Sequence, residues 1–413
     1  MGGRYWIETL GCPKNQVDSD KLEGTLAADG MAPAASPAEA DLVVVNTCAF
    51  IENARQESVD TVLALAGARA DGARLVVTGC MAERYGEELA EAMPEADLVA
   101  GFGVPVTLGA RPDAARIDLL NLPRPPARAP WAYVKVAEGC SRTCGFCAIP
   151  SFRGPQRSRP PEAILEEVDA LGVKEVVLVA QDLASYGKDV RGLGAGAVVS
   201  LVEAVAARVE RTRLLYLYPS DLTDELVDAI GATGIAYFDL SLQHVSKPLL
   251  RRMRRWGDGD RFLRRIESIR ERFPEAAFRT NFIVGYPGET EEDHDSLLAF
   301  LDAAQVDWCG LFAYSREDGT FAAGLDGAVP PDVVAERLAE AAEVAERVTF
   351  ARRRALVGEV VEVLVDRPGT ARSHREAPEI DGVVNVPRSL PAGATAKVLV
   401  TGAAGPDLDA VTV

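Results

Sequence analysis

The chain has 413 residues, of which 48% are hydrophobic and 26% are charged, the balance of an ordinary soluble globular protein with two or three domains. No apolar stretch reaches the roughly 18–20 residues of a membrane helix, and the N-terminus lacks the basic and apolar regions of a signal peptide, so we expect a cytoplasmic protein with no membrane segment. The formal net charge of −18 disfavours phosphate backbones and favours basic partners, although a generally acidic protein would show the same value.

Residues 1–122 alternate strand-like and helix-like segments. Three segments rich in β-branched residues predict strands, and two segments with helical spacing of apolar residues lie between them. This alternation predicts an N-terminal α/β domain with a parallel sheet covered by helices. The proline-rich stretch PRPPARAP, residues 123–130, predicts a linker. The expected strands are residues 5–12, 41–48 and 73–80, and the expected helices are residues 16–30 and 51–68.

Residues 131–350 restart the alternation with six βα units in a row. That pattern predicts a partial (β/α)6 barrel, with a doubly wound sheet as the alternative. In either fold, chemistry lies at the carboxyl ends of the strands. A long helix over residues 331–358 follows. The expected strands are residues 132–139, 175–182, 213–220, 237–244, 278–288 and 308–315.

The last part of the chain, residues 351–413, has a different pattern. Short strands separated by Gly, Pro and Asp predict a small antiparallel β-barrel of OB-like character. From Glu359 onward this tail has eight acidic and five basic residues, and after Phe350 it has no Phe, Trp or Tyr. An RNA-binding barrel is usually basic and offers aromatic stacking platforms. The composition therefore suits a basic protein partner better than RNA, unless the barrel is only a stabilising cap.

Three cysteines of the N-terminal domain share one position in the pattern. Cys12, Cys48 and Cys80 each end an expected strand, 36 and 32 residues apart, which is about one βα unit. Successive strands would therefore bring three thiols to the same rim of the sheet. A single strand-end cysteine is more often a core residue than a ligand. Three at equivalent positions predict a shared metal site.

A second triplet, Cys140, Cys144 and Cys147, follows the first expected barrel strand. The C-x3-C-x2-C spacing lacks the second half of a four-cysteine zinc pattern. It suits a 4Fe–4S cluster in which three thiolates leave one iron open to a ligand. An open position at the mouth of a barrel predicts a catalytic cluster.

With these residues the chain resembles the radical S-adenosylmethionine superfamily, and over its full length it resembles the methylthiotransferase family within it. The resemblance implies two 4Fe–4S clusters, one on each triplet, S-adenosylmethionine as radical source and methyl donor, and a terminal TRAM domain. It also implies a flavodoxin-type or ferredoxin-type electron donor. The motifs that carry it are TLGCPKNQVDSD, VVNTCAFIENARQES, VVTGCMAERYG, EGCSRTCGFCAIPSFRG, LVAQDLASYG, LQHVSKPLLRRM and NFIVGYPGETEED.

Two branches of that family are candidates, one acting on an aspartate of a small-subunit ribosomal protein and one on a tRNA adenosine. Ser151 stands where the tRNA branch usually has a tyrosine, and Tyr218 stands where it tends to have a histidine. Both positions resemble the ribosomal-protein branch, so we expect a basic ribosomal protein as substrate, with tRNA unlikely, and a monomeric enzyme. A non-catalytic iron–sulfur electron carrier or RNA-binding module is the alternative from another class.

Other site residues are implied by position. The resemblance places Phe146 against the radical cluster and Gln181, Asp182, Ile283, Val284 and Gly285 at the cofactor, with packing at the barrel rim as the alternative for Gln181 and Asp182. Gln243 and His244 end the fourth barrel strand at the same mouth, although a lone histidine is more often structural. Arg153, Arg157 and Arg159 could bind a carboxylate of cofactor or substrate, or could form ion pairs within their loop. We expect Cys309 in the core and His294 and His374 at the surface.

Overall fold

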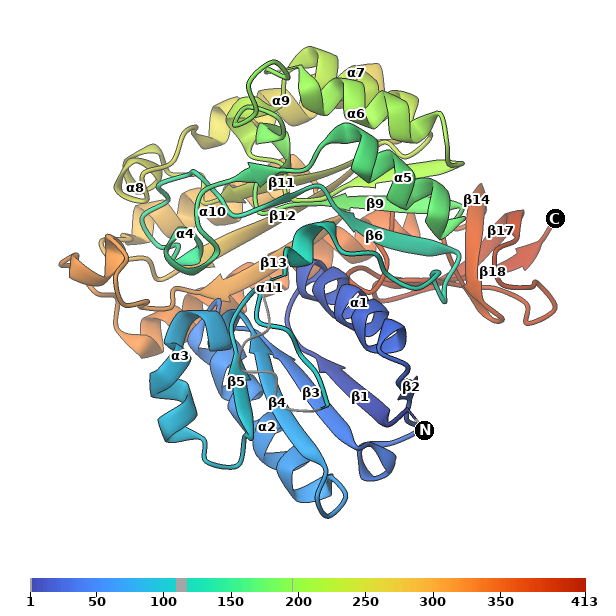
Figure 1. Ribbon diagram of the computed structural model, residues 1–413. Helices are drawn as coiled ribbons and strands as arrows, with labels where there is room; N and C mark the ends of the chain where they lie inside the picture. Colours follow the sequence, from blue (N-terminus) through green and yellow to red (C-terminus); the bar gives the residue numbers. More distant parts are fainter. Residues whose placement is uncertain (1, 109–116, 195) are drawn as a thin grey trace.

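The N-terminal domain is built on a five-stranded parallel sheet in the order β2-β1-β3-β4-β5. A computed structural model describes residues 2–108, 117–194 and 196–413. Figure 1 shows this sheet in blue below the rest of the molecule. The three expected strands are confirmed, and the two short edge strands were not foreseen. The elements are β1 Arg4–Thr9, α1 Pro13–Ala28, β2 Ala32–Pro33, β3 Leu42–Thr47, α2 Glu52–Ala68, β4 Arg74–Gly79, α3 Cys80–Ala92 and β5 Leu98–Ala100.

The central domain has six parallel strands that follow one another in chain order. Two three-stranded halves, β6-β9-β10 and β11-β12-β13, are joined by a parallel bridge between Leu217 and Leu240. A doubly wound sheet would reverse its strand order, so this arrangement confirms the partial barrel. The strands are β6 Trp131–Lys135, β9 Glu175–Val179, β10 Arg211–Leu214, β11 Tyr237–Gln243, β12 Ala277–Val284 and β13 Trp308–Ala313.

The third barrel strand is shorter than the sequence pattern predicts. The expected strand ran to residue 220, but β10 ends at Leu214. Tyr216 then adopts a left-handed backbone conformation, with a φ of 66°, which breaks the ladder. The remaining elements of this domain are β7 Ala137–Glu138, α4 Ile149–Arg153, β8 Arg157–Ser158, α5 Pro161–Leu171, α6 Ala197–Ala206, α7 Asp224–Ala232, α8 Lys247–Arg252, α9 Gly259–Arg272, α10 Glu291–Ala304 and α11 Pro331–Arg354.

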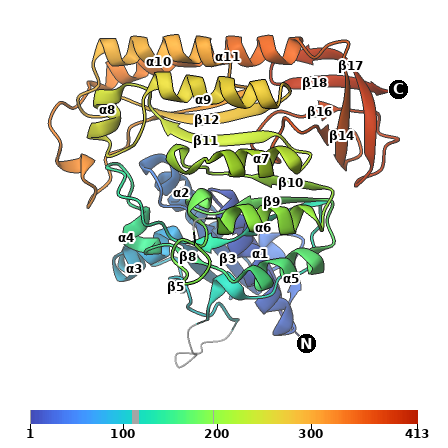
Figure 2. The same ribbon diagram turned by 90° about the horizontal axis from the view of Figure 1, so that it is seen from above.

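Helices cover the outside of the barrel, and α10 and α11 run side by side (Figure 2). The prediction that His294 lies at the surface is wrong. This residue of α10 is fully buried, and its Nε2 lies 2.8 Å from Glu340 of α11. The packing of α11 over α10 joins distant segments, so the local pattern did not reveal it. His374 is half-buried rather than exposed, and Cys309 packs partly buried against the core, as expected.

The terminal domain is a closed barrel in the order β14-β15-β16-β18-β17. All of its pairings are antiparallel except β16 with β18, which is parallel and was not foreseen. The strands are β14 Val360–Arg367, β15 Thr370–Arg372, β16 Val384–Asn385, β17 Thr395–Ala404 and β18 Asp407–Thr412.

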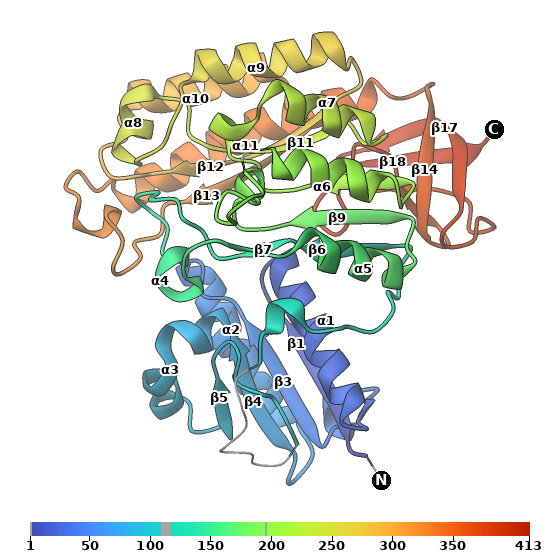
Figure 3. The ribbon, with the colours of Figure 1, turned by 45° about the horizontal axis from the view of Figure 1, so that its top comes forward.

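A segment of the terminal domain, residues 373–383, fills the base of the central barrel. The Tyr133 hydroxyl donates to the Pro378 carbonyl at 2.7 Å, and the Trp308 indole donates to the Arg375 carbonyl at 2.6 Å. Ala377 packs with inward-facing residues of the strands, and Val17 of α1 joins the same cluster from the N-terminal domain. The three parts of the chain therefore share one core inside the barrel. Figure 3 shows the N-terminal domain below the central barrel and the terminal strands β14, β17 and β18 at its side.

No helix in the described part of the chain is both long enough and apolar enough to span a membrane. Short 3-10 helices complete the structure at Pro37–Glu39, Leu119–Asn121, Leu183–Ser185, Pro219–Asp221 and Ala322–Gly324.

Candidate functional site

The first cysteine triplet lies at the carboxyl rim of the N-terminal sheet. Cys12 precedes α1, Cys48 directly follows β3, and Cys80 opens α3 directly after β4. Gly11 has a φ of 91°, and a Cβ there would lie 2.9 Å from the Cys48 sulfur. Only glycine lets the loop that carries Cys12 pass this close. Burial raises the pKa of Cys48 to about 12, and the neighbouring Cys12 and Cys80 add to the shift. The three cysteines therefore lie at the same rim of the sheet.

The second triplet lies in the loop that leaves the first barrel strand. The Cys140 N–H donates to the Gly154 carbonyl at 3.0 Å, which closes the loop at its base. The Gly145 N–H donates to the Met253 carbonyl at 2.8 Å, and the Ala322 N–H donates to the Gly145 carbonyl at 2.8 Å. Burial raises the pKa of Cys147 to about 12, with Cys144 and Cys140 adding to the shift. Segments after β11 and β13 thus hold this loop over the barrel mouth.

The donor set of each triplet, three thiols, has the chemistry of a 4Fe–4S site that keeps one iron open. The described residues contain no group of three or more His, Cys, Asp or Glu side chains that could close around one ion. A 4Fe–4S cluster places each thiolate on a different iron, so its ligands stand farther apart than the shell of one ion. Three thiols without a fourth protein ligand leave one iron open in each cluster.

Buried polar atoms without partners lie at the same mouth, where a polar cofactor could meet them. Gln181 donates from Nε2 to Glu138 at 2.8 Å, while its Oε1 has no partner. Asp182 accepts from Arg142 Nε at 2.6 Å, while its Oδ1 has no partner. The Nε of Arg255 is likewise buried and unpaired. Unpaired buried acceptors and a donor are costly unless a ligand satisfies them, and the amino and carboxylate groups of S-adenosylmethionine have the matching chemistry.

Comparison with known proteins decides the family. Ribosomal protein uS12 methylthiotransferase RimO of Kineococcus radiotolerans is 42% identical, with 97% of this chain and 96% of that protein aligned. The RimO protein of Moorella thermoacetica is also 42% identical, with 96% of each chain aligned. The chain belongs to the family of ribosomal protein uS12 methylthiotransferases.

Three parts of the chain also match known families separately. Residues 4–101 match the uncharacterized protein family UPF0004, residues 134–301 match the radical SAM superfamily, and residues 357–413 match the TRAM domain. Among solved structures, the radical S-adenosylmethionine methyltransferase TsrM from Kitasatospora setae has a TM-score of 0.50 at 14% identity, covering 86% of this chain and 90% of that one. That likeness concerns the fold alone. Family membership implies S-adenosylmethionine and 4Fe–4S clusters as cofactors.

Three further residues expected at the cofactor, Gln243, His244 and Phe146, lie at the barrel mouth and differ in burial and hydrogen bonding. Gln243 ends β11 with a φ of 72°, and His244 after it is fully buried. His244 Nδ1 accepts from the Ser246 N–H at 3.1 Å, and its Nε2 has no partner. Burial lowers the pKa of His244 to about 4, so the ring is neutral. Phe146 is partly buried against the barrel core.

Helix α11 packs closely against the carboxyl end of β12. Ile283 and Val284 are buried, and Gly285 follows with a φ of 79°. A Cβ on Gly285 would lie 2.4 Å from Val334 of α11, so glycine is required for this approach. Gly285 also lines a pocket of about 360 Å³ together with Tyr314. The role of these residues at the cofactor stays a prediction.

The three arginines expected as carboxylate ligands differ in position. Arg157 is exposed and pairs with Asp118 at 2.9 Å. Arg159 is buried, donates to the Lys135 carbonyl at 2.9 Å and pairs with Glu167 at 2.8 Å. Arg153 is buried, with its Nη2 3.0 Å from the Cys80 sulfur and its Nη1 2.8 Å from Glu138. All three are engaged in contacts within the chain, the alternative that the sequence left open.

Four residues of the site were missed by sequence reasoning. Asn15 and Glu138 lie within the cysteine motifs, so their closeness to the cysteines in the sequence could have indicated a role at the site. Arg142 lies between Cys140 and Cys144, and its guanidinium stacks 3.9 Å from the Tyr218 ring. Arg255 contacts Cys144 from 111 residues away, and no pattern in the sequence indicates that contact.

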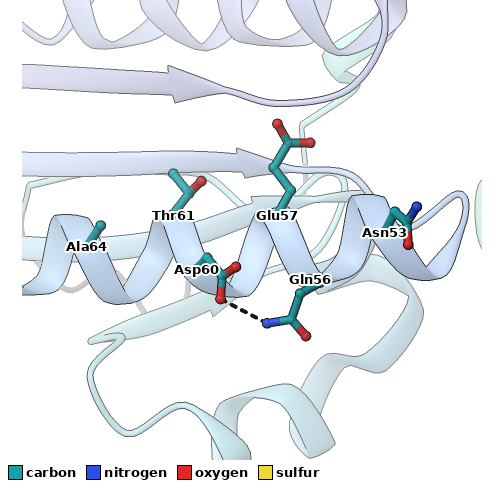
Figure 4. A pocket seen from close by; sticks show the side chains of 6 residues that line it. All are labelled: Asn53, Gln56, Glu57, Asp60, Thr61 and Ala64. Carbon is teal, nitrogen blue, oxygen red and sulfur yellow. Dashed lines mark hydrogen bonds between the residues drawn. The ribbon is translucent and has the colours of Figure 1, made fainter.

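A depression of about 540 Å³ along α2 lies apart from these groups (Figure 4). It is lined by polar side chains on the outer face of the helix, and Gln56 Nε2 donates to Asp60 at 2.8 Å there. None of its lining residues belongs to either cysteine triplet.

Proposed function

We propose that this protein is a radical S-adenosylmethionine methylthiotransferase that attaches a methylthio group to the β-carbon of an aspartate in ribosomal protein uS12. The observation that carries the proposal is the pair of three-thiol sites, one at the rim of each parallel sheet, in a chain that aligns with uS12 methylthiotransferases over nearly its full length.

Cys140, Cys144 and Cys147 would hold the radical cluster, and Cys12, Cys48 and Cys80 the auxiliary cluster. When bound, the clusters and S-adenosylmethionine supply the radical that removes hydrogen from carbon, together with the sulfur and the methyl group. An unactivated C–H bond is beyond acid–base side chains, which explains why the site needs them.

The chain's own residues bind and orient. Asp182 is fixed by Arg142 at 2.6 Å and keeps one oxygen free. Gln181 is fixed by Glu138 at 2.8 Å and keeps its carbonyl oxygen free. Both oxygens would accept hydrogen bonds from the amino group of S-adenosylmethionine. The base of the barrel is filled by packed side chains and by residues 373–383, which exclude water from that end and leave the mouth as the open side.

The acidic character of the protein supports a basic ribosomal protein as substrate over tRNA. The net charge is −18, and after Phe350 the terminal barrel carries no aromatic residue on which bases could stack. We further propose a flavodoxin-type or ferredoxin-type electron donor and a monomeric enzyme.

The test is a reaction with anaerobically reconstituted protein, reductant and S-adenosylmethionine, offered purified uS12 or tRNA. We expect uS12 to gain the mass of one methylthio group in place of one hydrogen, and about eight irons per chain. Modification of tRNA alone would favour the adenosine-modifying alternative. Formation of no 5′-deoxyadenosine would favour a non-catalytic iron–sulfur protein.

A further inference from the structure

One arginine side chain contacts a thiol in each triplet. Arg153 Nη2 lies 3.0 Å from the sulfur of Cys80, and Arg255 Nη1 lies 3.1 Å from the sulfur of Cys144. In the described residues these are the side-chain N–H groups that donate to a triplet sulfur. Each proposed cluster therefore has its own guanidinium.

Arg153 is surrounded by groups that offset its charge. It follows the radical loop on α4, yet it reaches the N-terminal domain, where it donates to Asn15 at 2.8 Å and approaches Asp18 at 3.4 Å. On the barrel side it donates to Glu138 at 2.8 Å. The side chain is buried, so two carboxylates and one thiol share its positive charge in a region of low dielectric.

Arg255 has no such compensation. Its guanidinium donates to the Ser241 carbonyl and lies 4.3 Å from the Tyr218 ring, and within the described part of the chain it forms no ion pair with a carboxylate. Its Nε is buried without a partner. Once the cysteines of the radical loop hold a cluster as thiolates, that cluster is the anionic group that this charge faces.

We propose that Arg255 and Arg153 raise the reduction potentials of the radical and auxiliary clusters respectively, each acting on its own cluster, with the larger effect from Arg255. Reduction adds one negative charge to a cluster. A hydrogen bond to a ligand sulfur and a nearby positive charge stabilise that added charge, and both are known determinants of cluster potential. Arg255 acts more strongly because no carboxylate offsets its charge. The inference rests on the proposed function, since it takes both triplets to hold clusters.

The experiment measures each cluster by itself in the full-length protein. Alanine at Cys12, Cys48 and Cys80 leaves the radical cluster, and alanine at Cys140, Cys144 and Cys147 leaves the auxiliary cluster. In each background, Arg255→Gln and Arg153→Gln are titrated with a graded reductant, and the reduced cluster is followed by electron paramagnetic resonance. We expect Arg255→Gln to lower the ratio of reduced to oxidised radical cluster about tenfold at a fixed potential, a shift of about 59 mV for a one-electron couple.

Arg153→Gln should shift the auxiliary cluster in the same direction by less, and neither variant should move the other cluster. Arg254→Gln is the matched control, because this neighbouring arginine lies 3.6 Å from the Phe321 ring instead of a thiol. It should change neither potential. Should Arg153→Gln fail to fold, Arg153→Lys replaces it. The shift should again be confined to the auxiliary cluster, because lysine cannot reproduce the fork that reaches Cys80, Asn15 and Glu138 together.

Clusters that assemble in the variants with unchanged potentials would overturn this inference and leave the proposed function intact. Equal shifts of both clusters in either variant would also overturn it, because they would indicate a general loss of structure. If the unsubstituted single-cluster proteins bind no iron, the proposed function itself fails.

Discussion

The charged side chains at the two ends of the central barrel have different kinds of partner. At the base, carboxylates and guanidiniums pair with one another and with carbonyls of residues 373–383. At the mouth, charged groups contact thiols or keep one atom unpaired. The ion pairs at the base connect the domains, whereas the charged groups at the mouth keep unpaired atoms that a ligand could contact.

Glu175 is the centre of the base. This buried residue at the start of β9 accepts from Arg213 at 3.0 Å and from Arg372 of the terminal barrel at 3.1 Å, with Arg211 at 3.5 Å. Burial would raise the pKa of Glu175, but the three arginines outweigh it and hold the pKa at about 2. One carboxylate therefore ties the terminal barrel to two strands of the central one.

The first and largest prediction separates the two cysteine sites at the mouth. Alanine at Cys140, Cys144 and Cys147 should abolish 5′-deoxyadenosine formation, because the radical cluster would lose every protein ligand. Alanine at Cys12, Cys48 and Cys80 should keep that reaction and abolish methylthiolation. The two products are measured by chromatography and by mass spectrometry of uS12. Methylthiolated product from the second variant would refute the assignment of the auxiliary cluster to the N-terminal triplet.

The second prediction concerns the base. Glu175→Gln leaves Arg211 and Arg213 buried without a carboxylate and leaves Arg372 with Asp366 alone, and removing one partner of a buried ionic network costs about 3–5 kcal/mol. Denaturant unfolding should show that loss, and limited proteolysis should release the terminal barrel sooner. Glu210→Gln is the control, because Glu210 pairs with Lys174 at the surface and should cost under about 1 kcal/mol. If the two variants are equally stable, Glu175 is not the residue that holds the ionic network of the base together.

The same contrast explains what could be predicted from the sequence. Strand-end cysteines and the six barrel strands follow from local patterns, since a βα repeat fixes which end of each strand meets the others. The contacts of Arg153 with Cys80 and of Arg255 with Cys144 join residues 73 and 111 positions apart, so tertiary packing alone reveals them. His294 was expected at the surface, but its contact with Glu340 of α11 comes from tertiary packing that the sequence pattern does not show.

The third prediction is a pH dependence that arises at the mouth. The pKa of His244 in the folded protein is about 4, below the ordinary value of 6.5, chiefly because burial disfavours the charged ring. The nearby Asp293 raises this pKa, while His294 and Arg337 lower it. Between these values the unfolded chain binds the proton and the folded chain does not. Stability is therefore fully present above about pH 6.5 and falls as the pH drops toward 4, by about 3 kcal/mol in all.

Urea unfolding between pH 4.5 and 7 measures this slope. His244→Asn should flatten it, because asparagine can accept from the Ser246 N–H but does not titrate. The corresponding histidine of the base is His374, which is half-buried and lies 2.9 Å from the Glu275 carbonyl. His374→Asn should reduce the slope less. A slope unchanged by His244→Asn would show that the ring is already charged or hydrated in the folded protein.

The smallest effect is expected away from both ends of the barrel, on the outer face of α2. Asp60 accepts from Gln56 one helical turn away, and both side chains are exposed. Because an exposed pair of this kind contributes a few tenths of a kcal/mol, Asp60→Ala should change the free energy of unfolding by less than about 0.5 kcal/mol. The rate of uS12 modification should stay the same at saturating and at low uS12. A raised KM for uS12 with unchanged 5′-deoxyadenosine formation would contradict this expectation. It would show that the outer face of α2 also contacts uS12, in addition to the barrel mouth.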